Sequence, residues 1–143
     1  MRKSLLLSIT LGMLLSMAAT PLAQQAQQPP ALSFDFYRTN VEPIFLKRRA
    51  GHARCYACHS QGTPLRLQEL SPGSAGWNEE QSKKNFEAVR RMVNPNDPAK
   101  SMLLIHPLAT DAGGDLFHNG GKHWTSQTEP EWQTLLAWVK GKR

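Results

Sequence analysis

The chain is 143 residues long, carries a formal net charge of +6 and contains only two cysteines. A chain of this length is long enough for one folded domain. The sequence contains no P-loop, nucleophile elbow or paired catalytic carboxylate motif, which excludes the common hydrolase and transferase sites. The excess of positive charge has no accompanying nucleic-acid-binding motif, so we expect no nucleic-acid partner.

Residues 1–23 predict a signal peptide for export. Arg2 and Lys3 form a positively charged start, and the apolar run behind them is shorter than the roughly 20 residues that span a membrane. Small residues (AATPLA) follow, so we expect cleavage there and a periplasmic protein, with an uncleaved membrane anchor as the alternative. Residues 24–31 (QQAQQPPA) predict a flexible tether, and residues 32–143 form the domain.

The first element of the domain is an amphipathic helix in SFDFYRTNVEPIFLKRR. Pro43 interrupts this pattern, so we expect a kink or a helix restart there. The apolar positions recur at helical spacing and predict a core-facing stripe: Phe34, Tyr37, Val41, Ile44 and Phe45.

The two cysteines follow this helix in CYACH, as Cys55, Cys58 and His59. A structural zinc site would need a second cysteine or histidine pair, and a thioredoxin-like pair would need a βαβ pattern around it. Neither pattern is present. The C-x-x-C-H spacing instead indicates covalent attachment of one haem c, with two thioethers and His59 as the proximal iron ligand. Export favours this interpretation, because bacteria attach haem to thiols outside the cytoplasm.

The basic stretch LKRRAGHAR lies just before the haem motif. It is either a docking face for an acidic redox partner or a solvated helix end, where positive charge is favourable.

The middle of the domain alternates loops and short helices. Residues 64–80 predict a loop, and residues 83–93 predict a short helix with Phe86, Val89 and Met92 or Val93 on one face. A turn follows in NPNDPAKS. The SMLLIHP segment predicts one or two helical turns that stop at Pro107.

The last element is a helix in TEPEWQTLLAWVKG. Thr128 and Glu131 have the spacing of a capping box, and Gly141 marks the helix end. The apolar residues Trp132, Leu135, Leu136 and Val139 share one face. No segment shows the alternation of a strand, so the predicted fold class is all-α, with three to five helices.

The order CYACH, NPNDPAKSMLL, HNGGK, EWQTLLAWVKG resembles class I-like cytochromes c, and more narrowly the planctomycete-type cytochrome c domains. The resemblance covers the whole domain. It implies a small cytochrome c-like fold around one covalently bound haem, with the first and last helices crossing beside it, and it implies electron transfer.

The second iron ligand is expected from the glycine-rich loop DAGGDLFHNGGKHW. Many of the cytochrome c domains that this chain resembles have a Met-Pro motif at this place, which this chain lacks. Some of them have His-Gly-Gly there, and this chain has HNGGK at that place. Glycines let a backbone approach a flat cofactor closely, and His118 lies among four of them. We therefore expect His118 to be the distal ligand. The alternatives are an open site and the residues His123, Met92, Met102 and His106.

These observations predict a periplasmic monohaem cytochrome c, bis-His ligated, that is an electron carrier rather than an enzyme. We expect redox proteins, acidic-faced or in a membrane respiratory complex, as its partners. Two alternatives stay open. One is a haem enzyme or gas-binding protein with an open distal site, such as a peroxidase. The other is a haem subunit of a membrane redox complex.

Overall fold

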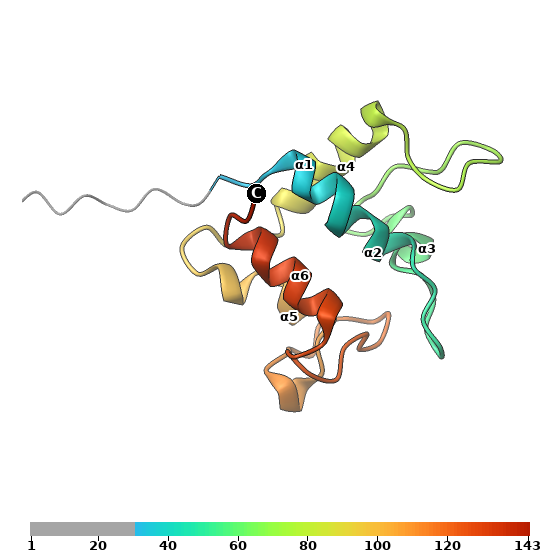
Figure 1. Ribbon diagram of the computed structural model, residues 1–143. Coiled ribbons are helices and arrows are strands. Elements are labelled where there is room, and N and C mark those ends of the chain that lie inside the picture. Colours follow the sequence, from blue (N-terminus) through green and yellow to red (C-terminus); the bar gives the residue numbers. More distant parts are fainter. Residues whose placement is uncertain (1–30) are drawn as a thin grey trace, which may run out of the picture.

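The computed structural model describes residues 31–143 of the chain (Figure 1). The predicted signal peptide and nearly all of the tether lie outside these residues. The all-α prediction is confirmed: the described part is helical and contains no strand, with isolated bridges at Arg49–His52 and Leu108–Trp124. None of its helices has the length and apolar character needed to cross a membrane.

The first helical segment runs without a break through α1 (Phe34–Phe36), a π-helical turn (Tyr37–Val41) and α2 (Glu42–Leu46). The hydroxyl of Ser33 caps its start by accepting a hydrogen bond from the Phe36 amide at 3.1 Å. Pro43 has no amide hydrogen to donate and lies in the first turn of α2. The helix therefore does not break at Pro43: the predicted kink or restart is replaced by a change from π-helical to α-helical structure just before this proline.

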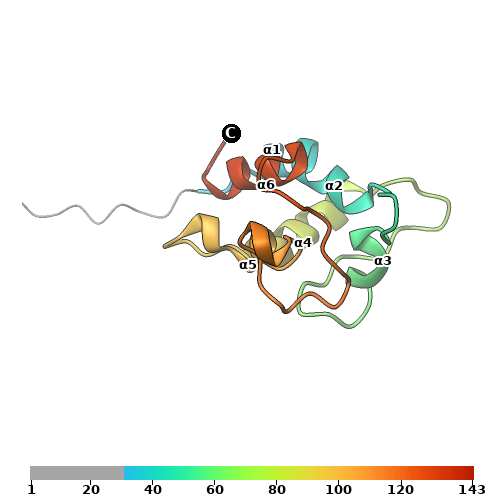
Figure 2. The same cartoon turned by 90° about the horizontal axis from the view of Figure 1, so that it is seen from below.

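Helix α6 (Pro130–Val139) packs against this first segment (Figures 1 and 2). The rings of Tyr37 and Trp138 lie 5.5 Å apart, and both side chains are fully buried. The indole N–H of Trp138 donates to the Ser33 carbonyl at 2.9 Å. The two ends of the described chain are thus joined through the core.

Helix α4 (Glu79–Arg90) begins four residues before the predicted start at residue 83 and ends three residues before the predicted end at residue 93. The earlier start has a clear cause. Asn78 accepts a hydrogen bond from the Gln81 amide at 2.9 Å, and the Gln81 side chain accepts one from the Asn78 amide at 3.0 Å. This capping box satisfies two amides at the helix start. The predicted helical position of Met92 is wrong, because Met92 follows the helix.

The predicted capping box of the last helix is also wrong. The N-cap of α6 is Glu129, whose carboxylate accepts hydrogen bonds from the Thr125 amide at 2.6 Å and the Ser126 amide at 3.3 Å. Instead of capping its own helix, Glu131 forms ion pairs with Lys47 and Arg49, which lie far from it in the sequence. Local spacing alone does not reveal such a distant partner.

Two short helices complete the described fold: α3 (Cys55–His59) and α5 (Met102–Ile105). Helix α5 is one turn and Pro107 follows it closely, as expected. It packs under α6, where the indole N–H of Trp132 donates to the Leu104 carbonyl at 3.3 Å. In Figure 2 the long loop after α5, coloured orange to red, extends toward α3. This loop and α3 face one cavity.

Candidate functional site

A cavity of about 510 Å³ lies between α3, the segment after it and the loop beyond α5. Small-molecule and cofactor sites commonly have volumes of about 300–1,000 Å³. Its lining includes all the site residues predicted from the sequence, both the favoured and the alternative ones: Cys55, Cys58, His59, Met92, Met102, His106, His118 and His123. The fold therefore brings residues from four separate segments to one place.

The two cysteines enter this cavity from α3, one turn apart. They are free thiols, with Cys55 partly buried and Cys58 exposed. Burial raises the pKa of the Cys55 thiol, and the nearby charge and hydrogen bond of Arg49 act against this rise. The two thiols therefore differ in their surroundings although they belong to one motif.

His59 is held in a fixed orientation by the segment after α3. Its Nδ1 lies 2.9 Å from the Leu65 carbonyl oxygen and 3.0 Å from the Thr63 hydroxyl. A carbonyl oxygen only accepts hydrogen bonds, so we assign the proton to Nδ1, which leaves Nε2 with a free lone pair. Burial lowers the pKa of His59, which favours the neutral ring that binds metals.

His118 has the same arrangement. Its Nδ1 lies 2.5 Å from the Gly121 carbonyl oxygen, so the proton is again assigned to Nδ1 and Nε2 is free. The backbone approaches the ring closely at Gly120, where an added Cβ would lie 3.2 Å from Cε1 of His118. The absence of a side chain at Gly120 thus gives the His118 ring its space.

The rings of His59 and His118 lie close together in the lining of the cavity. Their centroids are 6.1 Å apart and their planes differ by 18°. Metal–imidazole bonds of about 2 Å and ring bonds of about 1.3 Å give a centroid separation of ~6 Å for two imidazoles on opposite sides of one ion. The observed separation fits a single metal ion between the two rings.

His123 is the nearest competitor of His118. Its ring lies 5.7 Å from that of His118 and 4.8 Å from that of His52. Burial, followed by the positive charges of Arg49 and the neighbouring histidines, lowers the pKa of His123 to about 4. Its Nδ1 is buried and has no hydrogen-bond partner among the described residues.

The remaining alternatives have other contacts. His106 follows α5, and its Nδ1 lies 2.5 Å from the Asp115 carboxylate. Met102 is exposed at the start of α5, and Met92 packs partly buried against the core. Between residues 31 and 143, no three or more His, Cys, Asp or Glu side chains converge in a manner that would hold a metal ion.

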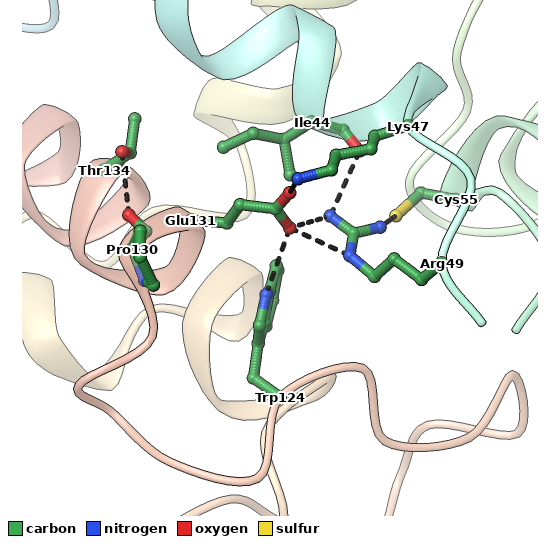
Figure 3. Close-up of polar contacts among 8 residues, drawn as sticks. All are labelled: Ile44, Lys47, Arg49, Cys55, Trp124, Pro130, Glu131 and Thr134. Carbon is green, nitrogen blue, oxygen red and sulfur yellow. Dashed lines mark hydrogen bonds and ion pairs between the residues drawn. The ribbon is translucent and has the colours of Figure 1, made fainter. Parts of the chain in front are cut away.

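A polar cluster that no sequence pattern predicted lies beside the cavity and is formed by Arg49, Glu131, Lys47 and Trp124 (Figure 3). Arg49 and Glu131 are 82 positions apart, and no local pattern links them. The orienting roles of Thr63 and Gly121 were also missed, although each contacts a histidine only three or four positions away. A signal for the first did exist, because Thr63 follows the C-x-x-C-H motif closely.

Comparison with known proteins adds no relative: no family model, curated protein or solved structure matches the chain.

Proposed function

We propose that this chain is a periplasmic monohaem c-type cytochrome that passes single electrons between redox proteins. Cys55 and Cys58 would hold the haem through thioethers, and His59 and His118 would bind its iron from opposite sides. The observation that carries this proposal is the pair of imidazoles whose ring centroids lie 6.1 Å apart, with two free thiols in the same cavity.

The donor set fits this cofactor. A porphyrin would supply four nitrogens to the iron, so this chain would have to provide only the remaining ligands, and His59 and His118 would do so. His59 and His118 each donate Nδ1–H to a backbone carbonyl, which leaves both Nε2 atoms free to bind. When bound, a haem iron with two such ligands exchanges one electron between its ferric and ferrous states.

The chain's own contribution is to hold this site unchanged between the two oxidation states. The Leu65 and Gly121 carbonyls fix the two imidazoles. Apolar side chains such as Phe45 and Leu103 line the cavity and offer an apolar surface to a flat cofactor. Two imidazole ligands give a lower reduction potential than an imidazole paired with a methionine sulfur. We therefore expect a low-potential carrier.

The cytochrome c-like fold and the export of the protein are part of the proposal. The packing of Tyr37 against Trp138 supports the fold, because it joins the first and last helices through the core. The composition of residues 1–23 supports export. Exposed Lys47 and Arg48, just before the cysteine motif, support an acidic redox partner.

Visible, near-infrared and EPR spectra of the purified holoprotein test the ligand assignment. We expect a low-spin haem in both oxidation states, with near-infrared and EPR features of two nitrogen ligands. His118→Ala should give a high-spin ferrous form that binds CO, whereas the matched variant His123→Ala should stay low-spin. The reverse result would identify His123 as the ligand, and a protein without bound tetrapyrrole would exclude the whole proposal.

A second candidate function is a peroxidase-like haem enzyme, which needs an acid–base group beside an open iron site. The Nδ1 of His123 favours it, since His123 lines the same cavity and this nitrogen has no hydrogen-bond partner among the described residues. In that case wild-type protein should bind CO readily, and His118→Ala should leave the resting spectrum unchanged.

A further inference from the structure

Arg49 connects three parts of the fold around Cys55 (Figure 3). Its Nε donates to Oε2 of Glu131 at 2.8 Å, and its Nη2 donates to the same oxygen. Nη2 also donates to the Ile44 carbonyl at 3.3 Å, at the end of α2. The guanidinium lies 5.5 Å from the centroid of the Trp124 ring, which packs against it.

These contacts immobilise the guanidinium. The Arg49 side chain is only 12% exposed, although arginine is usually a surface residue. A planar guanidinium bound to a carboxylate, a carbonyl and a ring has little freedom to rotate. Its remaining nitrogen, Nη1, is therefore held in one direction, and it points at the sulfur of Cys55 at 3.7 Å.

The second cysteine has no equivalent partner. Cys58 is exposed, and its sulfur makes no hydrogen bond like that of Cys55 with Arg49 among the described residues. Cys55 is the less exposed thiol, and burial raises its pKa while Arg49 acts against this rise. The thiol that needs the most help to react thus lies next to a fixed cation.

We propose that Arg49 is a positioning residue for covalent attachment of the cofactor at Cys55. It holds the sulfur against the cavity wall, where the thiol adds to a vinyl group of the porphyrin. The S–H bond and the vinyl π bond break, a C–S bond forms to one vinyl carbon, and the thiol hydrogen goes to the other carbon. The addition consumes no oxidant or reductant. This inference rests on the proposed haem function.

The test compares Arg49→Lys with Lys47→Met in the full chain, exported and matured with haem. Lys47 binds the other oxygen of Glu131 at 2.7 Å but does not contact the thiol, so its variant is a matched control. Each holoprotein is unfolded and treated with iodoacetamide, and labelled cysteines are located by peptide mass spectrometry. A pyridine haemochrome spectrum reports whether a vinyl group remains.

We expect both cysteines of the wild type and of Lys47→Met to resist labelling, because both are thioethers. In Arg49→Lys we expect labelled Cys55, unlabelled Cys58 and a haemochrome band shifted toward that of a haem with one free vinyl. Attachment at Cys55 should slow about tenfold, the low end of what a hydrogen bond to a charged group supplies. General destabilisation would affect both cysteines alike, so this selectivity identifies a positioning role.

Full protection of Cys55 in Arg49→Lys would overturn the inference while leaving the haem proposal intact. Labelling of both cysteines in the wild type would overturn the haem proposal itself. If Arg49→Lys fails to accumulate, Arg49→Met combined with Glu131→Leu removes the buried pair without leaving a lone charge. The same selective labelling of Cys55 is expected there, and its absence counts against the proposal.

Discussion

Glu131 provides a direct test of how burial changes the strength of an ion pair, because it binds two cations in different surroundings. Arg49 is 12% exposed and makes two hydrogen bonds to one carboxylate oxygen, whereas Lys47 is 63% exposed and contacts the other. Partly buried, doubly hydrogen-bonded charges couple by about 2 kcal/mol, and exposed pairs by less than about 1 kcal/mol. We expect the Arg49–Glu131 coupling free energy to be several times the Lys47–Glu131 one.

Two double-mutant cycles measure these couplings, with Arg49→Met, Lys47→Met and Glu131→Gln as single variants and urea unfolding of the holoprotein as the assay. The pH dependence is a second check. Burial would raise the pKa of Glu131, but the hydrogen bonds and charges of Lys47 and Arg49 outweigh it and hold that pKa below its usual range. A lowered folded-state pKa stabilises the fold above the unfolded-state pKa, and this stabilisation is lost as pH falls through the folded-state value.

The Arg49–Glu131 coupling should therefore disappear on acidification. Equal couplings for the two cations, or a coupling to Arg49 that persists when Glu131 is protonated, would refute this reasoning. Either result would also weaken the positioning role of Arg49, because that role requires a guanidinium fixed by the carboxylate.

Three further outcomes follow from the contacts of single residues. Burial raises the pKa of Glu42, so ionisation of this carboxyl lowers the stability of the fold as pH rises through the folded-state pKa. Glu42→Gln should therefore be more stable than the wild type at neutral pH. Thermal unfolding at acidic pH should show that this advantage vanishes. Gly114→Ala should destabilise the protein by about 3 kcal/mol in urea unfolding, since its Cβ would lie 1.9 Å from the Leu108 carbonyl oxygen, whereas Gly76→Ala meets open space and should have no effect. Gly120→Ala, with its Cβ 3.2 Å from the His118 ring, should change the EPR signal but not the melting temperature, and an unchanged signal would argue against His118 as a ligand.

The fold was predictable where apolar spacing and a local breaker coincide. The stripe from Tyr37 to Phe45 is buried as the spacing indicated, although Phe34 at its start is only partly buried. On α6 the predicted Trp132, Leu135 and Val139 are buried, whereas Leu136 is only partly buried. Pro43 lies where the π-helical turn gives way to α2. The start of α4 was readable too, because Asn78 and Gln81 form a capping box, but the prolines and glycines before it favoured a loop interpretation. The same pattern misled at Thr128, since Glu131 gains more from two cations than from capping its helix.

The site divides in the same way. Cys55, Cys58 and His59 were identifiable because five consecutive residues carry their pattern. The loop that carries His118 takes its shape from distant contacts: Lys122 donates to the carbonyls of Asp115 and His106, at 2.7 Å for the latter. Such contacts join residues up to 16 positions apart, and glycine content alone does not encode them.

Which of His118 and His123 is the better second ligand depends on the contacts that each ring must lose to present a free nitrogen to a metal ion. His118 already donates Nδ1–H to the Gly121 carbonyl, so binding through Nε2 breaks no existing contact. His123 is held differently, because its amide donates to the Pro107 carbonyl at 2.7 Å and its ring packs on His52. Its Nδ1 is buried without a hydrogen-bond partner among the described residues, so no contact keeps the proton on Nδ1 and leaves Nε2 free. Binding a metal through Nε2 therefore costs less at His118 than at His123, which favours His118 as the ligand. A bis-His spectrum that survives His118→Ala would contradict this argument.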